Sequence, residues 1–276
     1  VAILTVEDLE SAGMNVAMPA ERIKTAKGKG AAPERPMLAR GRVRFVGEAI
    51  ALIVADSMAA ARDAADAIVV DYRGIDAATD YRSDGNQIHP EAPKNIAFDW
   101  DIGQAKATDA ALRKSAHVVS FDLLHNRVIG NSMEPRGCWA EWVGGRCHVA
   151  VSGQGVWGLR NELAKSYGKP RGKFRVTTPD VGGGFGMKGM LYPEYFVVAE
   201  AARMTGHPVR WMSDRTEAML TDTAGRDLLA RVELGFDASH RITAYRLDVL
   251  SNLGAYNSTF AQLIQSELLS KVFTGP

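Results

Sequence analysis

Apolar and polar residues alternate differently in the two parts of the chain. In the first 85 residues, short apolar runs predict strands at 1–5, 43–46, 49–55 and 68–72. Ser57 is placed to cap a helix that runs through Ala67. Thr5 and Asp8 have the spacing of a capping box, which predicts a helical turn after the first strand. This β-α-β order predicts a small α/β domain that ends near Asp80.

The second part is richer in strands. Alternating runs predict strands at 117–124, 138–142, 146–152, 174–178, 209–213, 228–236 and 241–251. Residues 144–145 and 237–240 are expected to be the turns of two hairpins. Helical patterns cover 156–167, where Gly168 ends the helix, and 195–205 after Pro193. The prolines and glycine of 80–94 are typical of a linker. We therefore expect an α+β protein with domains at 1–85 and 86–276.

Composition excludes several classes of function. The chain has 276 residues, of which 46% are hydrophobic and 24% charged, as in an ordinary soluble protein of two domains. A net charge of +1 gives no electrostatic case for nucleic acid or an acidic membrane. The basic segment 20–42 is expected to be a solvated loop, with a phosphate-binding arm as the alternative.

Several features indicate where the protein works and how much of it the sequence represents. No apolar run is long enough to span a bilayer, and no signal peptide is visible. Cys138 and Cys147 suit a reducing compartment with free thiols, so a cytoplasmic location is expected; a disulfide is the alternative. The chain begins at Val1 without an initiator methionine and stops directly after an apolar segment. We expect an internal piece of a longer polypeptide.

The most unusual stretch is the turn Gly182–Gly186, in which four glycines surround Phe185. Glycine lacks a Cβ, so backbone N–H groups in such a run can approach a ligand closely and adopt positive φ. A phenylalanine in this setting is costly to expose, so it should wedge against the core or a ligand. The alternative is a tight turn without a ligand.

Local motifs for other chemistries are weak or absent. Gly184–Gly189 matches the dinucleotide pattern G-x-G-x-x-G, but Pro193 delays the following helix and separates it from the last glycine. A phosphate-loop NTPase is excluded because Met187 precedes Lys188 and Gly189 follows it. The histidines lack the spacing of metal ligands, and no G-x-S-x-G motif occurs.

Two polar residues are further candidates. Glu134 precedes Pro135 in an apolar β region, so its carboxylate needs a partner or a ligand. The residues alone favour a structural role for Glu134, as the cap of a turn or the partner of an arginine. Gln154 ends a strand and precedes a helix, where its amide can donate to a ligand or bond the backbone. Here too the residues alone favour the structural role.

Taken together, these stretches resemble the molybdenum hydroxylases of the xanthine dehydrogenase and aldehyde oxidase family, in the large molybdopterin-binding chain. The likeness covers nearly the whole sequence, and its motifs occur in the family's order: 1–9, 43–48, 49–56, 70–72, 132–135, Gln154, 180–186, Lys188, 193–194, 206–209 and 215–217. The carbon monoxide dehydrogenase, isoquinoline oxidoreductase and bacterial aldehyde dehydrogenase branches look closest, because Arg226-Asp227 replaces an Arg-His pair common elsewhere.

The resemblance implies an α/β hammerhead domain followed by the first part of a molybdopterin-binding domain with mixed and antiparallel sheets. It implies a molybdenum–molybdopterin cofactor, in the cytosine dinucleotide form of bacterial enzymes, with no protein ligand on the metal. Gln154 would hydrogen-bond the apical oxo ligand, and Gly184, Phe185 and Gly186 would line the metal centre. The family's catalytic glutamate is expected beyond Pro276, so no catalytic residue is assigned.

The same resemblance implies what the complete protein does. It would oxidise a small molecule, such as an aldehyde, an N-heterocycle or carbon monoxide, with water as the oxygen source. Electrons would leave through [2Fe-2S] clusters and FAD on partner chains, in a dimer of heterotrimers, and this piece alone would be inactive. Two alternatives stay open. One is a Rossmann-type nicotinamide- or flavin-binding domain, which requires a parallel sheet with Gly184 at a helix N-terminus. The other is a non-catalytic scaffold that keeps the fold.

Overall fold

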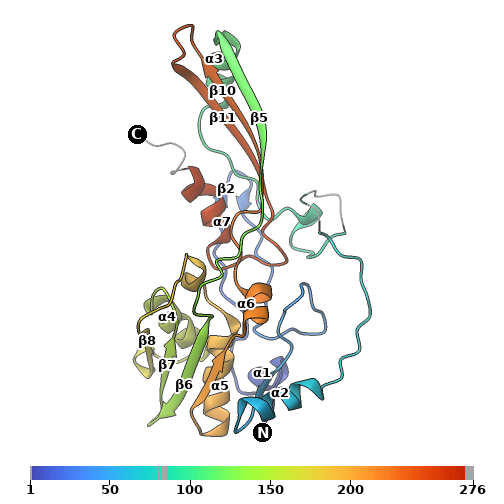
Figure 1. Ribbon diagram of the computed structural model, residues 1–276, viewed down its shortest axis with the longest axis vertical. Helices are drawn as coiled ribbons and strands as arrows, with labels where there is room; N and C mark the ends of the chain where they lie inside the picture. The colour runs from blue at the N-terminus through green and yellow to red at the C-terminus, as the bar shows by residue number, and fades with distance from the viewer. Residues whose placement is uncertain (1, 80, 82–85, 271–276) are drawn as a thin grey trace. The chain divides into compact units, whose positions relative to one another are not determined.

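The computed structural model describes residues 2–79, 81 and 86–270. The chain divides into two compact units, each assembled from three separate segments. The first unit comprises Val1–Ala20, Pro33–Ala77 and Ile129–Thr223, and the second comprises Glu21–Ala32, Ala78–Val128 and Ala224–Pro276. Helices and strands both contribute to each unit, which confirms the α+β class (Figure 1).

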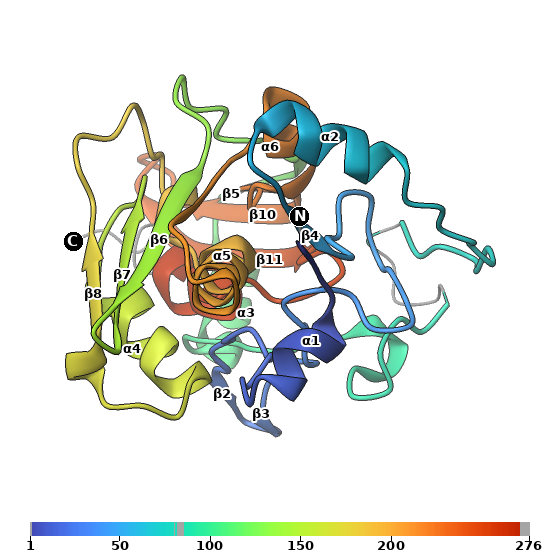
Figure 2. The same cartoon turned by 90° about the horizontal axis from the view of Figure 1, so that it is seen from below.

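A mixed four-stranded sheet forms the centre of the first unit. Its strand order is β8 (Phe174–Thr177), β7 (Arg146–Val151), β6 (Gly137–Val143) and β9 (Val209–Met212). Strand β6 is antiparallel to β7 and β9, whereas β7 and β8 are parallel. Figure 2 shows β6, β7 and β8 side by side. The β6–β7 hairpin turns at Gly144 and Gly145, whose φ values of +56° and +73° suit a two-residue loop.

Helices α4 (Trp157–Ser166) and α5 (Pro193–Thr205) cover one face of this sheet. Trp142 joins the layers, because its Nε1 donates to the Ala199 carbonyl on α5 at 2.8 Å and its ring contacts Tyr167 and Phe174. Helix α5 is buried along most of its length, and Pro193 occupies its first turn, where no backbone donor is needed. The helix ends at Thr205, as expected from the sequence, and Gly206 caps it in the left-handed conformation.

The remaining elements of the first unit are short. Strand β1 (Ala2–Leu4) pairs antiparallel with β4 (Leu52–Val54). Helix α1 (Val6–Ser11) begins with the expected capping box, in which the Thr5 N–H donates to Asp8 Oδ2 at 2.7 Å. The Ser57 hydroxyl accepts the Ala60 N–H at the start of α2 (Met58–Asp66), and α6 covers Arg215–Thr221.

Two predicted strands of this region are wrong, and a third is shorter than expected. Residues 43–46 and 68–72 form no strand, and only Leu52–Val54 of 49–55 does. Val69 is 94% exposed and Tyr72 63% exposed, so these apolar side chains are not buried on a sheet. A β-rich composition yields a strand only where a neighbouring strand pairs with it, and the described residues provide no such neighbour here. Part of the predicted linker, residues 80 and 82–85, lies outside the described residues.

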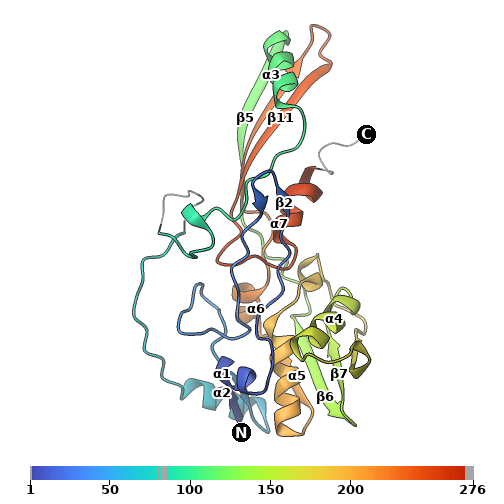
Figure 3. The ribbon, with the colours of Figure 1, turned by 180° about the vertical axis from the view of Figure 1, so that it is seen from behind.

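The second unit contains a three-stranded antiparallel sheet in which β10 (Leu228–Phe236) is central. Its neighbours are β5 (His117–His125) and β11 (Ile242–Ser251), and α3 (Ala105–Lys114) contacts the sheet (Figure 3). Asp237 forms the expected turn, since its Oδ1 accepts the N–H groups of Ser239 and Arg241. Shorter elements complete the unit: β2 (Lys24–Thr25), β3 (Gly28–Lys29), α7 (Ala261–Leu263) and a π-helical turn at Ile264–Leu268.

Two further sequence expectations are settled by the structure. Cys138 and Cys147 are both free and buried, as expected for reduced thiols. Within residues 2–79, 81 and 86–270, every helix is too short or too polar to cross a membrane.

We predict that Gly206→Ala destabilises the protein by about 1 kcal/mol, because φ at this position is +69° and a Cβ strains the left-handed backbone. Gly158→Ala on α4 is the matched control: φ there is not positive, no heavy atom lies within 4 Å of the added Cβ, and alanine favours a helix. Urea unfolding of both variants measures the difference, and equal stabilities would contradict the prediction.

Candidate functional site

The glycine turn lies in the first unit, after β8, and precedes a 3₁₀ turn at Met187–Gly189. Gly183 and Gly186 adopt φ values of +97° and +84°, which L side chains rarely reach. Phe185 also has a positive φ, +51°, and is 75% exposed. The expected contact of the ring with the core is therefore wrong, and its contact with a ligand stays a prediction.

The structure places Gln154 directly against this turn. The Gly186 N–H donates to Gln154 Oε1 at 2.9 Å, and the Gln154 N–H donates to the Lys188 carbonyl at 3.1 Å. A Cβ added to Gly184 would lie only 2.4 Å from Gln154 Cδ, so glycine is required for this approach. The end of β7 and the glycine turn, which are distant in sequence, thus form one surface.

This surface offers hydrogen-bond donors without protein acceptors. The Gln154 carbonyl oxygen is engaged by Gly186, which leaves the amide NH₂ group. Among the described residues, neither this NH₂ group nor the N–H groups of Gly184 and Phe185 have an acceptor. Such donors suit a ligand that presents oxygen or sulfur atoms.

Glu134 braces the start of the turn. Its Oε2 accepts from the Gly182 N–H at 2.8 Å, from Lys188 Nζ at 2.8 Å and from the Ser152 hydroxyl at 3.1 Å. Its own N–H donates to the Gly182 carbonyl at 3.1 Å. Burial opposes ionisation, but the hydrogen bonds from Lys188, Gly182 and Ser152 and the charge of Lys188 together outweigh it and hold the pKa of Glu134 below its usual value. The structural role expected for Glu134 is confirmed, with a lysine as its partner instead of an arginine.

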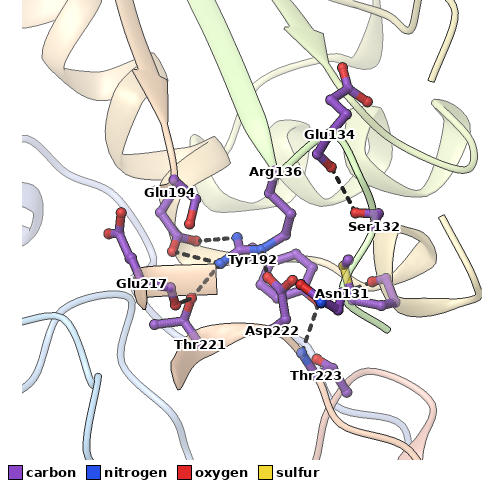
Figure 4. A network of polar contacts seen from close by, with 12 residues as sticks. Asn131, Ser132, Glu134, Arg136, Tyr192, Glu194, Glu217, Thr221, Asp222 and Thr223 are labelled. Atoms are coloured by element: carbon purple, nitrogen blue, oxygen red, sulfur yellow. Dashed lines mark hydrogen bonds and ion pairs between the residues drawn. The ribbon is translucent and has the colours of Figure 1, made fainter. Parts of the chain in front are cut away.

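A second polar network surrounds the buried guanidinium of Arg136 (Figure 4). Arg136 donates to Asp222 Oδ1 at 2.5 Å, to Glu194 Oε2 at 3.1 Å and to the Thr221 hydroxyl at 2.7 Å. Its Cζ lies 3.7 Å from the centroid of the Tyr192 ring. Burial lowers the pKa of Arg136, but the charge and hydrogen bonds of Glu194, together with Tyr192 and Tyr195, outweigh this effect, and the net shift is upward. Glu194 is therefore an ion-pair partner that fixes α5 to β6.

Arg215 holds the segment before Glu134. Its guanidinium donates to Asn131 Oδ1 and the Ser132 carbonyl at 2.8 Å, and to the Met133 carbonyl at 3.0 Å. Glu217 lies two residues further along α6, where burial and the charge of Glu194 both raise its pKa. The motif 215–217 thus holds the segment 131–133 that precedes Glu134, and no hydrogen bond joins it to the glycine turn among the described residues.

Sequence reasoning missed the supporting roles of Lys188, Ser152 and Tyr192. The Tyr192 hydroxyl donates to the Met187 carbonyl at 3.0 Å and accepts the Thr223 N–H at 3.0 Å, which fixes the end of the turn. The side chain of Lys188 is fully buried. The sequence gives no signal that Lys188 is buried, and only the fold shows that Glu134 is its partner.

Within the part of the chain that the structure describes, no three His, Cys, Asp or Glu residues are grouped so that they could hold a metal ion. What the surface offers is backbone and carboxamide donors. Comparison with known families agrees with this chemistry. Residues 88–276 match the model of the molybdopterin cofactor-binding domain, and residues 1–76 match the a/b hammerhead domain of aldehyde oxidase and xanthine dehydrogenase. The chain belongs to this family.

Its family relatives include large subunits of known oxidoreductases. The chain is 33% identical over 229 residues to the nicotine 6-hydroxylase large subunit of Paenarthrobacter nicotinovorans. This alignment covers 80% of this chain and 28% of the relative. It is 29% identical to the carbon monoxide dehydrogenase large chain of Hydrogenophaga pseudoflava, over 93% of this chain and 33% of the relative. The crystal structure of quinoline 2-oxidoreductase from Pseudomonas putida 86 aligns with a TM-score of 0.80 and 30% identity, over 94% of this chain and 33% of that chain. The family member described here thus spans about a third of the length of these relatives.

We predict that Arg136→Leu lowers the free energy of unfolding by about 3–5 kcal/mol, because Glu194 and Asp222 then stay buried without their cation. Arg210→Leu, which changes an exposed arginine on β9 of the same sheet, should cost less than about 0.5 kcal/mol. Chemical denaturation of the two variants tests this, and similar losses would show that the network does not stabilise the fold.

Proposed function

We propose that this chain is part of the large subunit of a molybdenum-dependent hydroxylase, and that Gln154, Gly184, Phe185 and Gly186 contact its cofactor. The observation that carries the proposal is the pairing of Gln154 with the glycine turn, which leaves the carboxamide NH₂ group and two backbone N–H groups without protein acceptors. Membership of the molybdopterin-binding family supplies the identity of the ligand.

The residues present fit such a cofactor. A molybdenum–molybdopterin group supplies two-electron redox chemistry at a metal that carries oxygen and sulfur ligands. The Gln154 amide would donate a hydrogen bond to an oxygen ligand, while the exposed Phe185 ring would shield the centre from water. Gly184 and Gly186 permit the close approach, because neither brings a side chain into the space. The chain itself binds and orients; it supplies no metal ligand in this proposal.

The complete protein would oxidise a small molecule with water as the oxygen source, and would pass electrons to [2Fe-2S] and FAD subunits. The relatives named above are a nicotine 6-hydroxylase, a quinoline 2-oxidoreductase and a carbon monoxide dehydrogenase, and the hammerhead domain is that of aldehyde oxidase and xanthine dehydrogenase, so an N-heterocycle, an aldehyde or carbon monoxide is the proposed substrate class. We further propose that the cofactor has the cytosine dinucleotide form and that the complete protein is a dimer of heterotrimers in the cytoplasm. The boundary between the two domains is proposed at residues 85–86, and the catalytic base is proposed to lie outside this piece. None of Glu134, Glu194 and Glu217 is assigned that role, since each takes part in the packing described above.

The Rossmann alternative is not supported by the topology. Only one pair in the four-stranded sheet is parallel, and α5 begins at Pro193 instead of directly after the glycines. The scaffold alternative predicts a folded complex that binds no cofactor. It is less favoured because the Gln154 NH₂ group and the N–H groups of Gly184 and Phe185 lack acceptors among the described residues and can donate to a ligand.

The direct test is to purify the complete polypeptide with its partner subunits and to measure molybdenum by mass spectrometry and pterin by fluorescence. We expect both to be present in stoichiometric amounts. An active complex that contains neither would contradict the proposal, and a folded, inactive complex without either would favour the scaffold.

We predict that Gln154→Ala lowers kcat of the complete enzyme by roughly 10–100-fold, because a hydrogen bond to the metal's oxygen ligand is lost. Gln154→Glu should lower kcat similarly, since it keeps the acceptor for the Gly186 N–H but lacks the donor. Gln104→Ala, at the exposed start of α3 and without a capping hydrogen bond, should leave kcat unchanged. Steady-state kinetics measure kcat of each variant, and a wild-type kcat in both Gln154 variants would show that Gln154 does not contact the cofactor.

A further inference from the structure

The Glu134–Lys188 ion pair is unusual in its burial. Lys188 is 0% exposed in its side chain, whereas that of Glu134 is 35% exposed. Among the described residues, Glu134 is the acceptor for the Lys188 ammonium, at 2.8 Å. A buried ammonium is strongly disfavoured without its counter-charge, so the position of Lys188 and that of Glu134 are tied together.

Lys188 also contacts Gln154 and the turn through its backbone. Its carbonyl accepts the Gln154 N–H at 3.1 Å, and its N–H donates to the Gly184 carbonyl at 3.3 Å. One residue therefore joins Glu134 through its side chain to Gln154 and Gly184 through its main chain. Glu134 completes the connection, because it receives the Gly182 N–H on the same oxygen that receives Lys188.

These contacts leave the turn little freedom. Its start is held by Glu134 at Gly182, and its end by Gln154 at Gly186. A Cβ at Gly182 would lie 2.6 Å from Glu134 Cβ, and a Cβ at Gly184 would lie 2.4 Å from Gln154 Cδ, so the turn touches both side chains. A shift of the turn must move the Gln154 carboxamide, because Gly186 holds its oxygen.

We propose that the Glu134–Lys188 pair is a positioning device that fixes the Gln154 amide and the N–H groups of the glycine turn toward the cofactor. This inference rests on the proposed function. Lys188 is fully buried, and the Glu134 oxygen that bonds the turn accepts from three donors, so we assign the pair a positioning role instead of contact with the cofactor. Their effect on turnover passes through the positions of Gln154 and the glycine turn.

The test is a double-mutant cycle in the complete enzyme between Lys188→Met and Gln154→Ala. If Lys188 acts through Gln154, Gln154→Ala lowers kcat by roughly 10-fold or more in the wild type but by less than about twofold in the Lys188→Met background. The matched control is Arg203→Met, which likewise removes the cation of an ion pair, here that of the buried Glu200, but lies on α5 away from the turn. In that background the loss caused by Gln154→Ala should equal that in the wild type.

Hydrogen–deuterium exchange gives a readout that does not depend on a loaded cofactor. In the complete polypeptide, Lys188→Met should accelerate exchange of the Gln154 and Gly186 N–H groups by roughly 10-fold or more, and Arg203→Met should not. If Lys188→Met does not fold, Glu134→Asp serves instead, because it keeps the charge but withdraws the carboxylate from Gly182.

The two proposals fail in different ways. Additive losses in kcat together with unchanged exchange at Gln154 and Gly186 would overturn the positioning role while the enzyme still contains molybdenum. An absence of molybdenum and pterin from the wild-type complex would overturn the proposed function, and the exchange measurement would still decide whether the ion pair fixes the turn.

Discussion

The site depends on one contact: the glycine backbone of the turn lies close to two polar side chains. Gly182 lies against Glu134 and Gly184 against Gln154, at separations that any Cβ would violate. The glycines therefore serve to admit protein neighbours as much as a ligand. Because the turn is short, holding it on both sides sets the direction of every N–H group between the two contacts.

Charge burial supplies the rigidity behind this turn. Two separate ion-pair networks meet the segment 132–136 from opposite ends, one through Lys188 and the other through Arg136. Replacing a buried pair by apolar residues is often neutral for stability, so such networks are better explained by the geometry they impose. Here both networks fix the segment that carries Glu134 and leads into β6, and Arg215 fixes the residues that precede it. Ion pairs and hydrogen bonds thus hold the residues beneath the glycine turn, although the Phe185 ring itself is exposed.

The sequence predicted the second part of the chain better than the first, for a physical reason. Strands β6, β7, β10 and β11 are joined in hairpins, so their alternation and turn residues act locally and show in the sequence. Residues 43–46 and 68–72 have a similar composition but lack a pairing neighbour, which no local pattern reveals. The nearness of Gln154 to the glycine turn followed from family resemblance, whereas the Lys188–Glu134 pair spans 54 residues and depends on the fold. A residue's burial and its partner are properties of the assembled core, so single-residue reasoning about Glu134 named the wrong cation.

The discontinuous composition of the two units has a consequence for biosynthesis. The first unit draws on three separate segments, and the Asn15 N–H donates to the Ser166 carbonyl across about half of the chain. Neither unit can close while the ribosome has made only its first segment, and the early apolar residues must wait for strands that emerge much later. Such long-range closure is slow and leaves nascent hydrophobic surface accessible to chaperones and to aggregation. For a protein of this topology, yield in a heterologous host should respond more to the rate of translation than to small gains in final stability.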